Sequence, residues 1–341
     1  AFWDVVIMVI VPTLLYYVGT FFIVELEARK HNFTPPESSG KSAGQVMRTR
    51  GHHLISLIVL VILLGMGRSP QSSAIWAIVA VIVTSFISRD RNEWLTPKRI
   101  IKAAIEGAQN MVPVAVLLAG AGVIVGTFTL TGLGLKVSGL IMSLSGGIPI
   151  VALFLALLAS MIIGLSLPIT ATYIMTVVMV APALVKVGMP VHVAHLLAFY
   201  FAVLSEVSPP VGLSPSAAAA VTGGNPFGSM MQSWKYSLPA FLVPFLFSAT
   251  LVGANLLILD ATLAGFISAA ISGCASLFYL STGIVGFLRG PFSILERALL
   301  IAAAIIMAFN SLEFSAQGIL PLVIGAVVVV RNIMKYRRQK E

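Results

Sequence analysis

Long apolar runs recur from one end of the chain to the other, and they limit what it can fold into more than any other feature. Several of the runs reach the roughly 17–25 residues that cross the hydrocarbon core of a bilayer. Of the 341 residues, 58% are hydrophobic and only 10% are charged, which leaves too few polar side chains to cover a surface that faces water. We therefore predict an all-α integral membrane protein, folded as a multi-span helical bundle.

The apolar runs predict about nine or ten membrane spans, since some of the shorter runs pair into hairpins or form two halves of one span. A Gly-rich connector is expected at 131–147. The runs are 2–24, 54–67, 73–88, 111–130, 149–165, 168–186, 190–207, 211–221, 238–259, 263–287, 298–311 and 318–330.

Positive charge is concentrated between the apolar runs. The formal net charge of +9 would suggest a nucleic-acid partner for a soluble chain, but here it fits the positive-inside rule. The predicted topology places 18 of the 21 Lys and Arg on one side, and the exceptions are Arg68, Lys136 and Lys186. We therefore expect no nucleic-acid partner, and basic loops and a C-terminus in the cytoplasm. The sidedness is the same whether 149–186 dips into the membrane or crosses it twice.

The first interrupted apolar segment is 161–176. Pro168 lacks an amide donor and disfavours the helical conformation at the residue before it. Broken backbone at membrane depth is tolerated only where protein or a wet cavity satisfies the freed polar groups. We predict the tip of a re-entrant hairpin, 149–186, whose oxygen atoms suit Na⁺ and whose second helix suits an anionic group at its N-terminus. Small and hydroxyl-bearing residues surround the break: Gly164, Ser166, Thr170 and Thr172.

The second interrupted segment is 205–216. Pro209, Pro210 and Gly212 stand inside an apolar run, where they should unwind a crossing helix that spans 190–221. Two Pro/Gly-interrupted segments are the pattern expected of a transporter site near the bilayer midplane. The alternative is a pair of kinked structural helices, because proline kinks are common in membrane helices.

Glu206 is the only acid in this crossing segment. A charge at the bilayer centre costs about 2.5–3.5 kcal/mol on insertion scales, so the side chain should face a cavity, hold a proton or have a partner. It could bind a cation, carry a proton, or lie protonated near the mouth of the site. For His192 and His195, an interfacial or hydrogen-bonded structural role is the plainer interpretation.

The candidate ligands follow from the two interrupted segments. Those predicted to bind substrate are Ser166, Pro168, Thr170, Thr172, Ser208, Pro209 and Pro210. Those predicted to bind the coupling ion, with Na⁺ as the metal, are Gly164, Ser166, Thr170, Glu206, Ser208, Val211 and Gly212.

These motifs resemble a known family, the large membrane subunit of the tripartite ATP-independent periplasmic (TRAP) transporters, in particular the fused permeases of the TAXI type. The run 164–174 resembles their GxGLPTTAAYI hairpin, and 208–211 looks like their TPPV break. The likeness runs over about residues 1–250 and is weak after 260. Departures from the family pattern are Ser166 in place of Gly, Ile169 in place of Thr, and Glu206 and Pro215 around the break.

The resemblance implies half of an inverted-repeat elevator transporter in a bacterial or archaeal cytoplasmic (inner) membrane. A periplasmic substrate-binding protein would deliver a small organic anion, and a Na⁺ or H⁺ gradient would drive its import. No cofactor is expected besides this coupling ion, and membrane lipids surround the bundle. Residues 2–24 look like the segment that follows the first repeat, so the first-repeat half would be encoded upstream or separately.

Two other classes of function are a membrane-embedded enzyme that uses Glu206 and His195 as acid and base, and a non-transporting scaffold. The sequence has no metal-ligand spacing, nucleophile elbow or phosphate-binding loop, and we predict that the chain is not an enzyme. Its single cysteine, Cys274, excludes an intrachain disulfide.

The same features divide the chain into three segments. Residues 1–102 should hold scaffold helices and cytoplasmic loops. Residues 103–237 should form a transport-type repeat with the hairpin and the broken helix. Residues 238–341 should form C-terminal membrane helices and a basic cytoplasmic tail.

Overall fold

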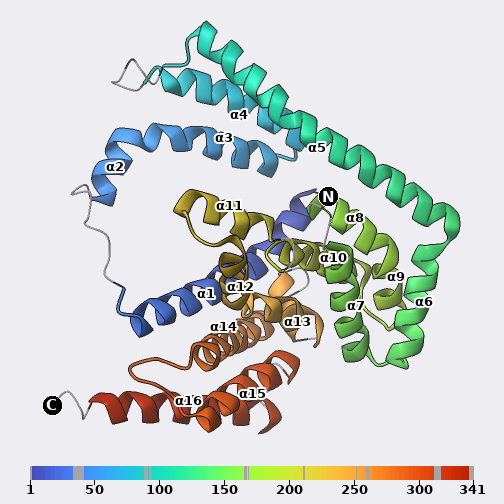
Figure 1. The fold of residues 1–341 in the computed structure, drawn as a ribbon, viewed down its shortest axis with the longest axis vertical. Helices are drawn as coiled ribbons and strands as arrows, with labels where there is room; N and C mark the ends of the chain where they lie inside the picture. The colour runs from blue at the N-terminus through green and yellow to red at the C-terminus, as the bar shows by residue number, and fades with distance from the viewer. Residues whose placement is uncertain are drawn as a thin grey trace. The chain divides into compact units, whose positions relative to one another are not determined.

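The computed structural model (Figure 1) describes residues 2–33, 42–87, 91, 94–164, 167, 169–209, 212–250, 252–258, 261–310 and 316–337. Nearly all of these residues are helical, and the one β-bridge among them joins Phe287 to Pro291. The predicted all-α membrane bundle is therefore confirmed. The chain forms two compact units, Ala1–Val6 with Thr34–Val116 and Ile7–Phe33 with Leu117–Glu341.

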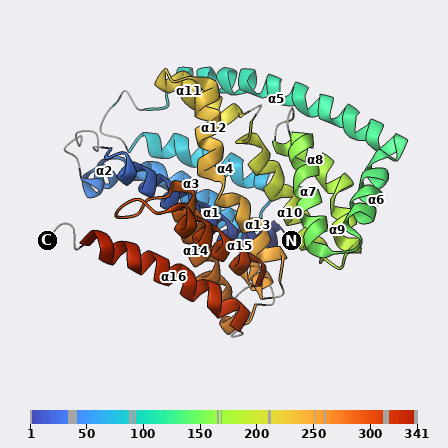
Figure 2. The same cartoon turned by 60° about the horizontal axis from the view of Figure 1, so that its bottom comes forward.

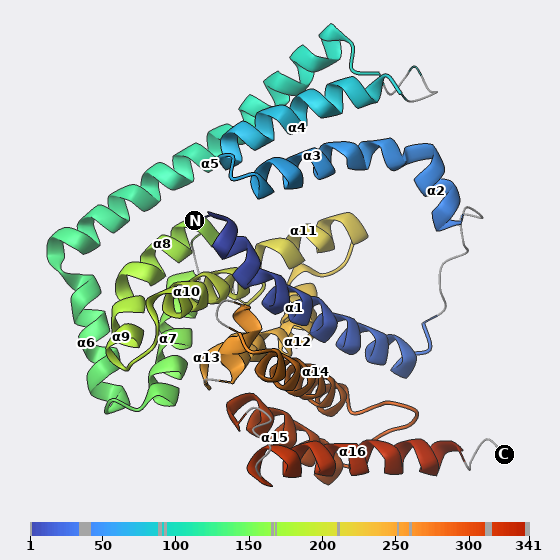
Figure 3. The same ribbon diagram turned by 180° about the vertical axis from the view of Figure 1, so that it is seen from behind.

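The first unit contains a helical hairpin. Helices α3 (Leu54–Gly65) and α4 (Pro70–Ser85) lie side by side in Figures 1 and 3, as predicted for the two short apolar runs. Ser69 caps α4 by accepting a hydrogen bond from the Ser72 amide. The other elements of this unit are α2 (Ala43–Arg50), the short 3₁₀ helix η1 (Gly51–His53) and the first part of α5 (Pro97–Thr131).

The second unit holds both interrupted segments. Its elements, in chain order, are α1 (Phe2–Lys30, from Ile7), the end of α5, α6 (Leu133–Ser145), α7 (Pro149–Gly164), α8 (Ile169–Met179), α9 (Ala181–Lys186), α10 (Val191–Glu206), α11 (Leu213–Thr222), α12 (Pro226–Ser237), η3 (Ala240–Leu242), α13 (Val243–Ser248), η4 (Gly253–Leu257), α14 (Leu263–Val285), α15 (Ile294–Asn310) and α16 (Ala316–Arg337). The bounds of α7, α10 and α11 match three of the predicted halves within about two residues, whereas the predicted arm 168–186 is divided between α8 and α9.

Small residues bring α7, α8 and α10 together, and these helices lie side by side in all three ribbon views (Figure 2). In lipid, helices associate through close packing, and small side chains let their backbones approach. On α7 and α10 the small residues recur every fourth position and are fully buried up to the break. They are Ala152, Ala156, Ser160 and Gly164 on α7, and Ala194, Ala198 and Ala202 on α10.

Charged side chains gather where α1 and α14 end. Lys235 on α12 donates to the buried Glu27 carboxylate over 2.8 Å. Lys30 donates to the carbonyl of Val285 over 2.9 Å, and Arg297 donates to the two preceding carbonyls over 2.9 and 3.0 Å. Cations are favoured at this position because the C-terminus of a helix carries partial negative charge.

The last turns of α16 also contact the unit near the end of α14. The Asn332 amide donates to the carbonyl of Gly290 over 3.3 Å, and the Tyr336 hydroxyl donates to the carbonyl of Pro291 over 3.3 Å. The end of α1, Lys235, the turn before α15 and the end of α16 therefore share one side of this unit. The sequence prediction had also placed these four segments on one side.

Two sequence predictions were wrong. The Gly-rich stretch 131–147 is mostly helix α6, because only Gly132, Gly146 and Gly147 take left-handed conformations and the residues between them stay helical. The apolar run 238–259 is not a long span but η3, α13 and η4. The chain folds back there so tightly that a Cβ on Gly253 would overlap the Leu246 carbonyl. Buried packing in the bundle, rather than lipid, accounts for its apolar character.

Four described helices are long and apolar enough to cross a membrane: Asp4–Lys30, Ile169–Lys186, Leu263–Val285 and Ile319–Arg337. The apolar helices Leu54–Gly65, Pro70–Ser85, Pro149–Gly164 and Val191–Glu206 are shorter. The described part of the chain therefore has fewer full-length spans than the nine or ten that the apolar runs predicted. The reason is that a hairpin arm, or one half of a broken helix, is too short to cross a bilayer by itself.

Gly283 on α14 tests the packing of α14 against α15. A Cβ there would lie 2.7 Å from Ile301 Cγ1 and 3.1 Å from the Arg297 carbonyl oxygen. We expect Gly283→Ala to lower the stability of the folded protein by about 1–3 kcal/mol, because overpacking forces the helices apart. Thermal unfolding in detergent, followed by tryptophan fluorescence, measures the loss.

Gly139→Ala is the matched control, since Gly139 is also helical but has open space around its missing side chain. Equal melting temperatures for the two variants would contradict the packing of α14 on α15.

Candidate functional site

The two interrupted segments meet at Gly164, the last residue of α7. A Cβ at this position would overlap the side chain of Ser205 on α10 and would lie 3.2 Å from Thr172 Cγ2 on α8. Gly164, Thr172 and Ser205 are all buried. The break of the hairpin therefore lies directly against the end of α10, where the second break begins.

The hairpin break places its hydroxyl groups on different faces. Thr172 is fully buried, and its hydroxyl donates to the Leu167 carbonyl over 3.1 Å. Thr170 is exposed, so the structure does not bring it to the contact at Gly164. The predicted ligands Ser166 and Pro168 lie outside the described residues.

The second break follows Glu206, where α10 ends. Ser208 is buried, and its hydroxyl donates to the Leu204 carbonyl over 2.9 Å. Gly212 precedes α11 with φ of 41°, and a Cβ there would overlap the Met230 side chain. Both the backbone conformation and the lack of space therefore require glycine. Pro209 is half-buried, and the predicted ligands Pro210 and Val211 lie outside the described residues.

Glu206 connects the two halves of the broken helix. Its Oε1 atom is 3.4 Å from the hydroxyl of Ser214, which donates to it from the first turn of α11. The carboxylate is half-buried. It therefore lies at the break itself, as predicted, rather than along the uninterrupted part of α10.

The helix ends around the contact have opposite polarity. α7 and α10 both end here, and the C-terminus of a helix carries partial negative charge. At the end of α14, Lys30 and Arg297 donate hydrogen bonds to the terminal carbonyls. Among the described residues, no Lys or Arg is seen to donate a hydrogen bond to the ends of α7 and α10. The N-termini of α8 and α11, which favour anions, follow directly after the two breaks. The arrangement can thus favour a cation and an anion close to each other.

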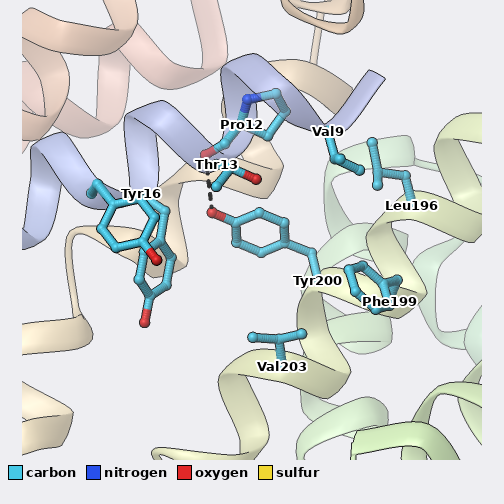
Figure 4. Close-up of a pocket in the computed structure, with 9 residues that line it drawn as sticks. Val9, Pro12, Thr13, Tyr16, Leu196, Phe199, Tyr200 and Val203 are labelled. Atoms are coloured by element: carbon cyan, nitrogen blue, oxygen red, sulfur yellow. Dashed lines mark hydrogen bonds between the residues drawn. The ribbon is translucent and has the colours of Figure 1, made fainter. Parts of the chain in front are cut away.

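A cavity of about 250 Å³ lies between α1 and α10. Among its lining residues, Val203 is nearest in sequence to Glu206, which it precedes by three positions. Figure 4 shows Tyr200 pointing at the carbonyl of Pro12, to which its hydroxyl donates over 3.4 Å. The Tyr16 and Tyr200 rings contact edge to face, with centroids 6.4 Å apart. The lining is mostly apolar, with the hydroxyls of tyrosines and Thr13 as its polar groups.

Ser205 and Tyr200 were not among the predicted ligands. Ser205 precedes Glu206 within the second interrupted segment, so a hydroxyl next to the acid was a usable signal. Tyr200 gives no signal of its own, because the cavity depends on how α1 crosses α10. Pro12, which lies inside the first apolar run and lines the cavity, is the residue whose type could have drawn attention to this part of α1.

Glu206 and His195 are not placed as a catalytic pair. Helix α10 runs without interruption from Val191 to Glu206, so the separation of eleven positions between the two residues corresponds to about 16 Å of helical rise. The geometry therefore gives no support to an acid–base site built from these two side chains.

An all-α membrane protein whose two interrupted helices meet at buried hydroxyl groups belongs to the class of solute permeases. The family model described as "Tripartite ATP-independent periplasmic transporter, DctM component" matches residues 2–256. The chain therefore belongs to this family and is a TRAP transporter permease subunit, as the sequence motifs indicated. No curated protein and no solved structure gave a significant match.

The contact between the two breaks can be tested by a pair of substitutions. We expect Gly164→Ala to destabilise the protein by about 1–3 kcal/mol, because the added methyl group overlaps Ser205. Adding Ser205→Gly should recover part of this loss, because it removes the overlapping atoms. Thermal unfolding of the two single variants and the double variant gives the coupling energy. Strictly additive effects would mean that the residues are not in contact.

Proposed function

We propose that this chain is the permease of an ion-coupled secondary transporter that imports a small organic anion delivered by a periplasmic substrate-binding protein. Na⁺ or H⁺ would be the coupling ion. The observation that carries this proposal is the contact of Gly164 with Ser205, which brings two interrupted helices together. Membership of the DctM family supports it, since that family is the permease component of a three-part transporter.

The oxygen atoms at the contact support a cation. The hydroxyls of Thr172, Ser205 and Ser208 each donate to a carbonyl of their own segment. A hydroxyl that gives its proton to a carbonyl keeps its lone pairs free to coordinate a cation. Carbonyls at the ends of α7 and α10 add further oxygen ligands. Gly164, Ser166, Thr170, Glu206, Ser208, Val211 and Gly212 remain proposed ion ligands, and the hydroxyls of Thr172 and Ser205 are added to them.

The substrate site is proposed at the N-termini of the two helices that follow the breaks. A carboxylate of the organic anion would be stabilised by the amide groups and the positive ends of α8 and α11. Ser166, Pro168, Thr170, Thr172, Ser208, Pro209 and Pro210 remain the proposed substrate ligands. A cation bound beside this site would lower the cost of bringing the anion into the membrane, which would couple the two.

The resemblance to TRAP permeases supports the rest of the proposal. The segment 103–237 would move as an elevator against scaffold helices, in a TAXI-type permease of a bacterial or archaeal inner membrane. Basic loops and the C-terminus would face the cytoplasm, as the positive-inside rule favours. Uptake into proteoliposomes that hold the complete permease, with candidate binding proteins and an imposed Na⁺ or H⁺ gradient, tests the function.

Thr172→Val should impair Na⁺-driven uptake. The substitution keeps the shape of a buried side chain but removes a proposed oxygen ligand. We expect the Na⁺ concentration for half-maximal uptake to rise about tenfold, the equivalent of one lost polar interaction. Thr222→Val is the matched control, because the Thr222 hydroxyl donates to the Ala218 carbonyl over 2.9 Å but lies away from both breaks. An unchanged Na⁺ dependence in the Thr172 variant would exclude this ligand.

Glu206→Gln tests coupling to protons. The amide of glutamine can still accept the hydrogen bond from Ser214, but it cannot carry a proton at neutral pH. If H⁺ is the coupling ion, uptake driven by a pH gradient should be abolished. Uptake that keeps its rate and its pH dependence in this variant would remove the proton role of Glu206. Glu106→Gln, at an exposed carboxylate on α5, is the control.

A further inference from the structure

A groove of about 370 Å³ lies along the surface of the second unit, apart from both breaks. One wall is formed by α8 and α9, and the other contains His195 on α10. The lining residues are Val177, Ala181, Pro182, Val185, Lys186 and His195.

The polar groups of the groove are basic. Lys186 ends α9 and is exposed, and His195 is half-buried on the second turn of α10. No carboxylate is among the lining residues. Within the described part of the chain, neither Lys186 nor His195 has an ion-pair or hydrogen-bonding partner. An ammonium group and an imidazole N–H are thus free to bind an anion in this groove.

The rest of the groove is apolar. Lys186 is the last residue of the candidate span Ile169–Lys186, so it marks the end of that helix near one membrane surface. Val185 and Pro182 precede it on α9, and Val177 lies on α8, before the turn at Val180. The basic end of the groove is therefore continued by an apolar stretch that both helices form.

We propose that this groove binds an acidic phospholipid. Its phosphate would lie between Lys186 and His195, and one acyl chain would lie along Val185, Pro182 and Val177. Charge complementarity selects an acidic headgroup, since the lining carries positive charge and no carboxylate. The apolar length selects a lipid over a free anion, which would leave that part of the groove unused. The site is independent of the proposed solute site at Gly164.

Native mass spectrometry of the detergent-purified protein can test the headgroup. Phosphatidylglycerol should bind more tightly than phosphatidylcholine. The double variant Lys186→Gln, His195→Gln should weaken phosphatidylglycerol binding roughly fivefold, the effect expected of one cation near a lipid headgroup. The control Lys136→Gln, His192→Gln makes the same chemical changes at exposed residues that do not line the groove. An equal loss of affinity in both double variants would overturn the proposal.

Two further measurements test the acyl-chain part of the groove. Val185→Trp fills the groove without changing its charge, and it should also weaken phosphatidylglycerol binding. Inorganic phosphate at millimolar concentration should not displace the lipid, because phosphate alone lacks the apolar contacts. Displacement by phosphate, or full binding of the lipid to the Val185→Trp variant, would show that no lipid lies in the groove. Monodisperse elution of each variant confirms that it has folded.

Discussion

The side chain of Ser205 occupies the space that a Cβ on residue 164 would need, and the site depends on this close approach. In a bilayer, an apolar side chain gains little by contacting another helix instead of lipid. Helices there associate through close packing between small residues instead. Rows of buried alanine, serine and glycine extend the same packing along α7 and α10. The two interrupted segments are therefore held together by the close fit of their side chains.

The terminal carbonyls of helices in this protein accept hydrogen bonds from two kinds of donor, cationic side chains and hydroxyl groups. At α14, Lys30 and Arg297 bond to the terminal carbonyls and neutralise the negative end of the helix with the protein's own cations. At α10, the hydroxyls of Ser205 and Ser208 donate to carbonyls near the end of the helix. A hydroxyl satisfies a carbonyl without adding charge, so the negative end remains available to a cation. The contrast between the two helix ends supports the cation site proposed at the end of α10.

Much of the fold could be predicted because its signals are local. The residues of α14 form a predicted span, and Pro168 and Gly212 mark breaks that the structure places in the same segments. Hydropathy wrongly predicted one long span at 238–259, because a short helix that is buried in a bundle is as apolar as a helix that faces lipid. Of the residues predicted as ligands, Thr172 lies at the contact and Thr170 is exposed, while Ser205, which also lies at the contact, was not predicted as a ligand.

The sequence by itself determined that the protein lies in a membrane and where two of its helices are interrupted. Proline lacks an amide donor and glycine tolerates a left-handed conformation, and both effects act within a few residues. Only the tertiary structure decided that Gly164 lies against Ser205 and that Glu27 pairs with Lys235, 208 residues away. Such contacts depend on how whole helices pack, because the energy of a distant pair is not encoded in the local preferences of either residue.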